Sequence, residues 1–242
     1  TLSSNLISIA AGQTSFPVTL TAIQDILVEV NETVILDITG VTNATENGTQ
    51  QETITITDDD DIPSVTLSVN PINIAEATGV STVTATLNII SALDVTVTLT
   101  ATGTATGGGT DYSLASNTIT INAGSTTGTT TVTAVQDALD EVNETVILDI
   151  TGVTNATENG TQQETITITD DDGAPTVTLS VSAASIAEAA GVSTVTATLS
   201  AASAQTVTVT LTATGTATGG GTDYSLASNT ITINAGSTTG TT

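Results

Sequence analysis

The chain has 242 residues and contains no Lys, Arg, His, Cys, Met or Trp, against 25 Asp plus Glu, so its formal net charge is −25. Without basic residues it lacks the electrostatic footprint that nucleic acids and anionic membranes require, and we expect no nucleic-acid partner. Without His, Cys and Lys, the usual general bases, thiol nucleophiles and zinc ligands are missing, which excludes most classes of enzyme.

Alternation of Thr with Val, Ile and Leu predicts half-buried β-strands along the chain. In its central part, strands are expected at residues 65–69, 81–87, 95–101, 118–121, 129–135, 145–151 and 165–169. Gly-rich or acidic turns separate them, at 107–111, 122–125 and 155–160 for example. Seven short strands at this spacing predict an all-β fold of the immunoglobulin-like β-sandwich type. No apolar run is longer than a few residues, so we expect no direct membrane insertion.

The sequence repeats itself with an offset of 112 residues: 29–60 recur unchanged as 141–172, and 95–130 recur as 207–242. A period of this length suits one β-sandwich domain, so we expect tandem sandwiches. With the boundary placed before Pro63 and Pro175, residues 62–173 form a complete repeat. Residues 1–61 are then the C-terminal half of one repeat and 174–242 the N-terminal half of another. The chain begins at Thr1, which indicates a processed form or a fragment.

Acidic residues of the complete repeat concentrate in four predicted turns or strand ends: Glu76, Asp111, the segment 137–144, and the run 170–172. Loops of a sandwich gather at its two ends, so acids remote in sequence can meet at one tip. Carboxylates that no basic side chain neutralises would repel one another unless cations lie between them. Ca²⁺ suits such a cluster best, because it accepts six to eight oxygen ligands in flexible geometry.

Four motifs in this order resemble the Calx-beta domain family. They are Ile-Ala-Glu-Ala-x-Gly at 74–79, Gly-Thr-Ala-x-Gly-Gly-Gly-Thr-Asp-Tyr at 103–112, Asp-x-x-x-Glu-x-x-Glu-Thr at 137–145, and Ile-Thr-Asp-Asp-Asp-x-x-Pro at 168–175. The resemblance extends through every repeat of the chain. It implies a seven-stranded sandwich whose distal loops bind a cluster of Ca²⁺ ions beside the neighbouring domain.

By position in these motifs, the resemblance implies calcium ligands at Glu76, Asp111, Asp137, Glu141, Asp170, Asp171 and Asp172, with Glu144 as an outer or bridging residue. The family has an acidic pair at the start of the third motif, whereas Gln136 precedes Asp137 here, and Asp140 is the candidate replacement. Val28 stands at the position of Asp140 in the preceding half-repeat. The same pattern recurs there in Asp25, Glu29, Glu32, Asp58, Asp59 and Asp60, and in the last half-repeat in Glu188 and Asp223.

Asn-x-Thr triplets recur as a second periodic feature, at Asn31, Asn43, Asn47, Asn143, Asn155 and Asn159. Their chemistry makes them candidate N-glycan acceptors in a cell that has the machinery. In a chain rich in Asn and Thr such triplets also arise by chance.

The favoured hypothesis is a calcium-binding structural repeat of an extracellular or cell-surface rod, adhesin, matrix protein or filament. Its partners would be neighbouring repeats or other copies of the chain, and Ca²⁺ would rigidify the junctions. Head-to-tail polymerisation is one form of this hypothesis, because residues 174–242 lack the later strands that 1–61 provide. Membership of a longer chain is the simpler explanation of the half-repeats.

Two further classes of function have some basis in the sequence. The alternative is a calcium-sensing regulatory domain of a membrane transport protein, because Calx-beta domains also occur in sodium–calcium exchangers. An enzyme would need an acid pair such as Asp137 and Glu141 for glycoside hydrolysis. Without Trp, and with only two Tyr, the chain offers little platform for a sugar, so we expect no enzyme.

Overall fold

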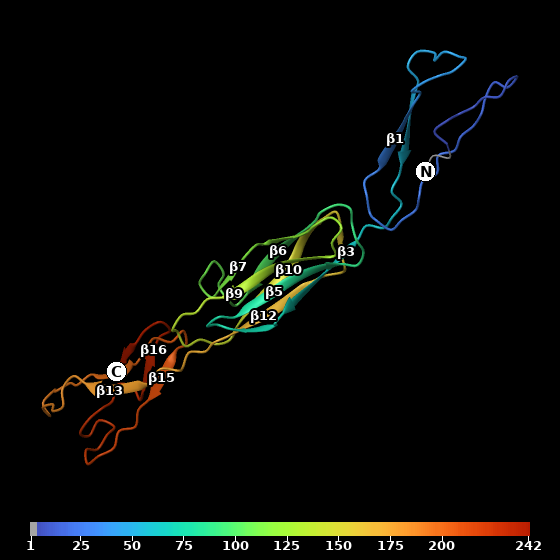
Figure 1. The fold of residues 1–242 in the computed structure, drawn as a ribbon. Coiled ribbons are helices and arrows are strands. Elements are labelled where there is room, and N and C mark those ends of the chain that lie inside the picture. Colours follow the sequence, from blue (N-terminus) through green and yellow to red (C-terminus); the bar gives the residue numbers. More distant parts are fainter. Residues whose placement is uncertain (1–3) are drawn as a thin grey trace.

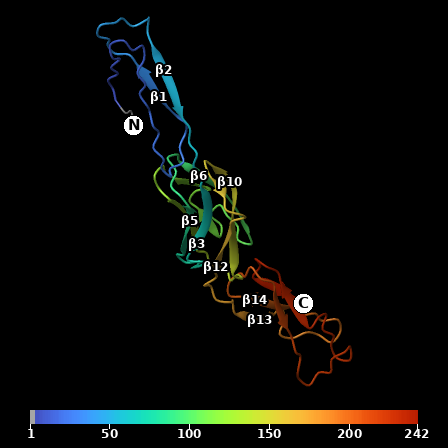
Figure 2. The ribbon, with the colours of Figure 1, turned by 90° about the vertical axis from the view of Figure 1, so that its right-hand side faces the viewer.

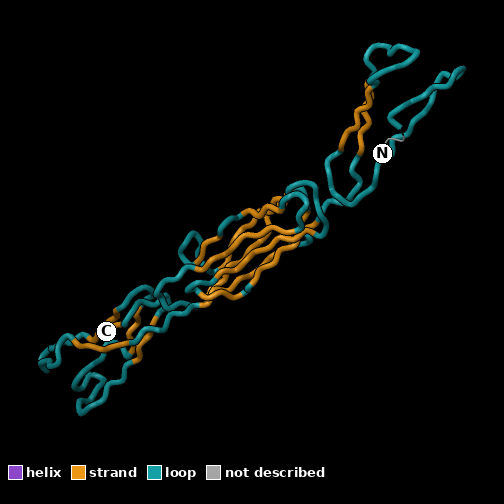
Figure 3. The backbone as a smooth tube through the Cα atoms, viewed as in Figure 1, coloured by secondary structure: helices purple, strands orange, loops and turns teal. Residues whose placement is uncertain are grey.

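A computed structural model describes residues 4–242, which consist of strands and loops without any helix (Figure 3). Accordingly, this part of the chain has no helix that could cross a membrane. The strands form three groups that follow one another along one long axis (Figures 1 and 2). The central group is the largest, and it carries most of the acidic motifs.

Two five-stranded sheets make up the central group. One has the order β4 (Asn73–Ala75), β12 (Gln163–Thr169), β10 (Glu144–Thr154), β6 (Val95–Gly103) and β8 (Thr118–Ile121). The other has the order β11 (Thr157–Glu158), β3 (Ser64–Asn70), β5 (Val80–Leu87), β9 (Thr127–Ala134) and β7 (Tyr112–Leu114). Neighbours are antiparallel except β4 with β12 and β11 with β3, which are parallel.

The core of the central group lies between the two sheets and follows the predicted alternation. In β5 the buried positions alternate with exposed or half-buried ones, so that Val83, Ala85 and Leu87 face inward. The core is almost entirely Val, Ile, Leu and Ala, with Tyr112 as its aromatic member. Apolar burial of this kind is the main stabilising contribution to such a sandwich.

The all-β, tandem-sandwich fold class predicted from the sequence is confirmed. All seven predicted strands are present, with bounds that differ by a few residues at most. Three short strands, β4, β7 and β11, were not predicted, because two or three residues are too few to display an alternating pattern. Two of these, β4 and β7, adjoin acidic residues of the candidate site.

The flanking groups are smaller. Residues before the central group form one hairpin of β1 (Glu32–Asp37) and β2 (Gln51–Ile56). Residues after it form the three-stranded sheet β13 (Val177–Val181), β14 (Val195–Leu199) and β17 (Thr239–Thr241), and the pair β15 (Val207–Thr210) and β16 (Thr230–Ile233).

Several residues that are buried in the central group have exposed equivalents in the flanking parts of the chain, although Ala197, Leu199, Ile231 and Ile233 form a small buried cluster after the central group. Leu67 is 5% exposed, whereas its equivalent Leu179 is 55% exposed. Likewise Ile119 is 1% exposed and its equivalent Ile7 is 52% exposed. Each flanking group therefore presents an apolar face that a second half of a sandwich would cover.

A close backbone contact shapes the acidic end of the central group. Gly103, at the end of β6, has φ = +124°, and a Cβ atom there would collide with the carbonyl oxygen of Thr145. That carbonyl accepts a hydrogen bond from the Ala105 N–H (3.1 Å), and the Thr145 N–H donates to the Thr104 hydroxyl (2.9 Å). Only glycine combines this φ with this approach. The contact fixes the start of β10, where Glu144 lies.

We predict that Gly103→Ala lowers the free energy of unfolding of the central repeat by about 2–3 kcal/mol, because it adds both backbone strain and a clash. Gly215→Ala is the matched control, since Gly215 is the equivalent residue, has φ = +137°, and has no atom near the added Cβ. Denaturant titration of both variants measures the difference. Equal losses would show that the close contact with Thr145 is unimportant.

Candidate metal centre

The acidic segments of the central repeat meet at one end of the sandwich because of strand register. In the first sheet, Glu144 at the start of β10 lies opposite Ile168 near the end of β12, and Ala75 at the end of β4 lies opposite Thr169. Glu76 and the run 170–172 therefore leave the sheet beside Glu144.

The second sheet brings the other acidic segments to the same end. Tyr112 at the start of β7 pairs with Ala134 at the end of β9. Asp111 immediately precedes β7, and the loop that contains Asp137 and Glu141 follows β9. The predicted meeting of these acids at one tip is thus observed in the central repeat.

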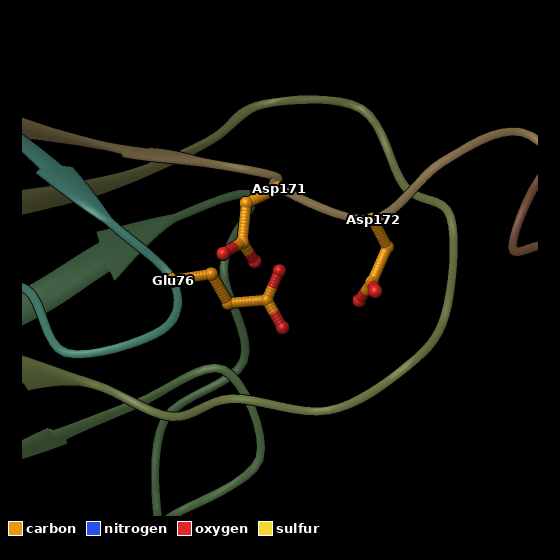
Figure 4. A group of neighbouring side chains, drawn as sticks. All are labelled: Glu76, Asp171 and Asp172. Carbon is orange, nitrogen blue, oxygen red and sulfur yellow. The ribbon is translucent and has the colours of Figure 1, made fainter.

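A first group consists of Glu76, Asp171 and Asp172, each with a carboxylate oxygen within 4.8 Å of the others (Figure 4). Glu76 projects from the turn after β4, and the two aspartates come from the segment after β12. Only 5% of Glu76 is exposed, and its Oε1 accepts a hydrogen bond from the Asp137 N–H (3.0 Å). Burial is the main cause that raises the pKa of Glu76, although the hydrogen bond from the Asp137 N–H opposes it.

A second group consists of Asp111, Glu141 and Glu144, all half-buried, with carboxylate oxygens again within 4.8 Å of one another. Asp111 is held in place because its Oδ2 accepts a hydrogen bond from the Thr106 N–H. Partial burial raises the pKa of Glu144 to about 7, with further contributions from its hydrogen bond to Asp111 and from the nearby negative charges. Partial burial, followed by the charge of Asp137, also raises the pKa of Glu141.

Asp137 and Asp170 lie at the same tip without belonging to either group. The Oδ1 of Asp137 accepts a hydrogen bond from the Leu139 N–H (2.7 Å), which closes a short turn. The Asp170 N–H donates to Oδ1 of Asn143 (3.3 Å). The Oδ1 atom of Asp170 is buried and has no hydrogen-bond partner. A buried carboxylate oxygen without a partner is costly, and a cation would satisfy it.

These residues fit a hard divalent cation. Every donor is an oxygen, several carboxylates are partly buried, and the chain has no basic side chain to neutralise them. Loose arrangements of carboxylate oxygens match the requirements of Ca²⁺, whereas Zn²⁺ favours the nitrogen and sulfur ligands that this chain lacks. The geometry thus supports the predicted ligands Glu76, Asp111, Glu141, Asp171 and Asp172, and it places Glu144 beside Asp111 and Glu141. The assignment of these residues as ligands remains a prediction.

Asp140 points elsewhere. Its Oδ2 accepts a hydrogen bond from the hydroxyl of Ser203 (2.7 Å), which belongs to the following repeat. Asp140 is not a member of either carboxylate group. Its predicted role as replacement for the carboxylate missing at Gln136 stays a prediction without support from this contact. The Gln136 amide donates instead to Oδ2 of Asp172 (3.4 Å).

In the flanking half-repeats, none of the predicted ligands within residues 4–242 joins a group of three carboxylates. The acids of the first half-repeat still gather, because partial burial and the charges of Asp25, Glu32, Asp58 and Asp60 raise the pKa of Glu29. In the last half-repeat, Asp223 bonds to the Thr218 N–H (2.6 Å), as Asp111 does to Thr106, while Glu188 is exposed. Asp59, Asp60 and Glu29 of the first half-repeat are equivalent to Asp171, Asp172 and Glu141, which belong to the two carboxylate groups of the central repeat. These three residues too remain predicted ligands.

Asn143 is a positioning residue that the sequence did not identify as such. Its side chain holds the backbone of Asp170, and its equivalent Asn31 accepts from the Asp58 N–H (3.2 Å) in the same way. The signal was its place inside the third motif, next to Glu144. All six predicted glycan acceptors are exposed, and glycosylation stays a prediction.

We predict that the calcium-free protein loses stability as the pH rises from about 4.5 to about 7. The pKa of Glu144 is raised in the folded state above its ordinary value of 4.5, so the folded state binds the proton more tightly. The resulting stabilisation is complete below the lower value and is lost as the pH rises through the upper one. Ca²⁺ would take the place of the proton and reverse the trend near neutral pH.

Thermal unfolding of protein stripped of calcium on a chelating resin measures this effect. Glu144→Gln serves as the control for the general effect of the −25 charge, because it removes only one titration. The wild type should lose more stability than the variant over this pH range. Parallel pH profiles would contradict the assignment to Glu144.

The family model of the Calx-beta domain matches residues 58–172 and 170–242. No curated protein matches the chain. Among solved structures, the apo-form Calx CBD1 domain is 17% identical, with 45% of this chain and 99% of that chain covered and a TM-score of 0.37. CBD12 from CALX1.2 is 18% identical, with 72% of each chain covered and a TM-score of 0.39. Since the family model covers more than half of its length, the chain belongs to the Calx-beta domain family, whose members bind Ca²⁺.

Proposed function

We propose that the chain is a calcium-binding structural part of an extracellular rod, such as an adhesin, matrix protein or filament. The observation that carries the proposal is the position of the acidic tip. The loop that contributes Glu141 also contributes Asp140, which contacts Ser203 of the following repeat. Ca²⁺ bound at the tip would therefore order the loop on which the next repeat rests.

The arrangement of the repeats supports a spacer role. The three strand groups lie end to end, so added repeats would add length (Figure 2). Near-identical repeats suit a protein whose role is to span a distance, since a spacer is lengthened by adding copies of one domain and needs no distinct binding site in each copy. Extracellular Ca²⁺ at millimolar concentration would fill even weak sites of this type.

Repulsion supplies the physical coupling between Ca²⁺ and stiffness. Without a cation, carboxylates within 4.8 Å of one another repel at the junction. The loop would then relax to separate them, and the next repeat would gain freedom to swing. Binding of the ion to the ordered tip alone stabilises that form by mass action.

We predict that Asp171→Asn reduces the rise of the unfolding temperature on addition of Ca²⁺, because it removes one ligand of the first group. Asp59→Asn is the matched control, since Asp59 is the equivalent residue and belongs to no carboxylate group of residues 4–242. Calcium titration during thermal unfolding, with Mg²⁺ as a second control, measures the effect. A rise that neither variant alters would argue against this site.

A second prediction concerns shape. Small-angle X-ray scattering should give a larger radius of gyration and a narrower distribution of sizes with Ca²⁺ than with chelator, because repulsion at the junctions is removed. Identical scattering under both conditions would leave Ca²⁺ as a stabiliser of single domains and contradict the rod.

The regulatory alternative requires a higher affinity for Ca²⁺ than the structural rod does. A calcium-sensing domain of a transport protein would respond at about 10⁻⁷–10⁻⁵ M, whereas extracellular modules respond at about 10⁻⁴–10⁻³ M. Isothermal titration of the wild-type chain separates the two. A micromolar midpoint would favour the sensor, and the oxygen-only tip is compatible with either value.

Head-to-tail complementation of half-repeats is a second proposal, supported by the exposed apolar faces of the flanking groups. Leu179 is 55% exposed and is equivalent to the buried Leu67, so another copy could cover it. We predict concentration-dependent association in sedimentation velocity, abolished by Leu179→Asp. Val192→Asp is the control, because the equivalent Val80 is itself exposed in the complete repeat. A chain that stays monomeric at all concentrations would end this proposal.

A further inference from the structure

Both junctions between repeats use the same backbone contact. At the first, Val28 forms a parallel bridge with Ser91, and the Ala92 N–H donates to the Val28 carbonyl (2.9 Å). At the second, Asp140 forms a parallel bridge with Ser203, and the Ala204 N–H donates to the Asp140 carbonyl (3.0 Å). The acidic loop of each repeat thus rests on a serine of the next repeat.

The receiving serine is held rigidly in both repeats. Ser91 and Ser203 are each only 1% exposed, although each lies where its repeat meets the preceding one. The Ser203 carbonyl accepts from the Gly236 N–H (2.8 Å), and its hydroxyl oxygen accepts from the Gln205 N–H (3.1 Å). With these bonds made, the hydroxyl proton is left to donate across the junction.

The two junctions differ in what receives that proton. Ser203 Oγ lies 2.7 Å from Oδ2 of Asp140 and 3.2 Å from its carbonyl oxygen. At the first junction the equivalent side chain is Val28, which has no acceptor. A hydrogen bond to a carboxylate is about twice as strong as one between neutral groups. Only the second junction has this additional fastening.

The side chains around the backbone contact also differ between the two junctions. The first junction has a hollow of about 510 Å³ lined by residues 25–27, residues 88–90 and Thr126, with isoleucine at positions 26, 89 and 90. Ile26 is 79% exposed there. At the second junction, alanine occupies the equivalent positions 138, 201 and 202. Both partners of the junction have changed, whereas residues 29–60 and 141–172 are identical.

We propose that Asp140 is a junction residue that fastens the calcium loop of the central repeat to Ser203, and that its partner is the following repeat of the same chain. The chain therefore has two kinds of junction. One is fastened by a carboxylate–hydroxyl hydrogen bond, and the other rests on the backbone contact beside an apolar hollow. The fastening uses no metal ion, so it stands whether or not the proposed calcium-dependent rod does.

Amide hydrogen exchange of the Ala204 N–H in the full chain tests the proposal, because that N–H is protected only while the junction is docked. Asp140→Val introduces the natural residue of the first junction and keeps the backbone acceptor. We expect about 10-fold faster exchange at Ala204 in both Asp140→Val and Ser203→Ala, the loss of one hydrogen bond to a charged group. The Leu99 N–H, bonded to Asn117 within the central repeat (2.8 Å), reports intact folding.

The reciprocal change is Val28→Asp, which places a carboxylate opposite Ser91. It should slow exchange at the Ala92 N–H by a similar factor and leave Ala204 unchanged. Unchanged exchange at Ala204 in both loss variants would overturn the proposal.

Calcium titration separates this proposal from the proposed function. If Asp140 were a calcium ligand, Asp140→Val would weaken calcium binding and Ser203→Ala would leave exchange at Ala204 unchanged, which would overturn the proposal. If the junction proposal holds, Asp140→Val and Ser203→Ala speed exchange at Ala204 alike and change the calcium midpoint alike, because both remove the same hydrogen bond and calcium binding is coupled to docking. A wild-type chain that binds no Ca²⁺ would contradict the calcium function alone, since the exchange of the variants is compared with that of the wild type at the same calcium concentration.

Discussion

Unneutralised negative charge is the constraint on which the rest of the molecule depends. The chain has 25 acidic residues and no basic ones, so every cluster of carboxylates must be balanced from outside the protein. The fold separates this charge from the apolar core. Val, Ile and Leu fill the space between the sheets, while the acids converge where β4, β10 and β12 meet the loops. Burial of apolar side chains therefore governs the stability of the core, whereas the ions in solution govern the order of the acidic tip.

Much of the fold could be predicted from the sequence, because the period-2 pattern is strong and the repeat gives the length of one domain. The strands that escaped prediction, β4, β7 and β11, are defined by their partners and not by their own pattern. Asn73–Ala75, for instance, is a strand because its backbone pairs with β12 at the edge of the sheet. The flanking groups show the same dependence on context. Leu67 and Leu179 have nearly the same sequence neighbours but differ in burial, because β3 packs against β12 whereas β13 has no equivalent of β12 beside it.

The candidate site was predictable in composition but not in detail. The motif positions located Glu76, Asp111, Glu141 and Asp171 at one tip, because acids at strand ends must share an end of the sandwich. The division into two groups depends on side-chain directions that no spacing encodes. Asp140 illustrates this limit, since it lies between Asp137 and Glu141 in sequence, yet its carboxylate faces Ser203 in the following repeat. Asn143, which the sequence marks only as a candidate glycan acceptor, also holds the backbone of Asp170.

Parallel pairing at the first and last long strands of the central repeat has a mechanical consequence. The chain enters through β3 and leaves through β12, and each of these has a short parallel partner, β11 and β4 respectively. The strands run along the long axis of the molecule (Figure 1). A pulling force on the two ends of the chain would therefore act along the strands and across the hydrogen bonds that join them, which are evenly spaced in a parallel pair. The bonds of each ladder would be loaded together in shear and not opened one by one, a geometry that suits a domain under tension.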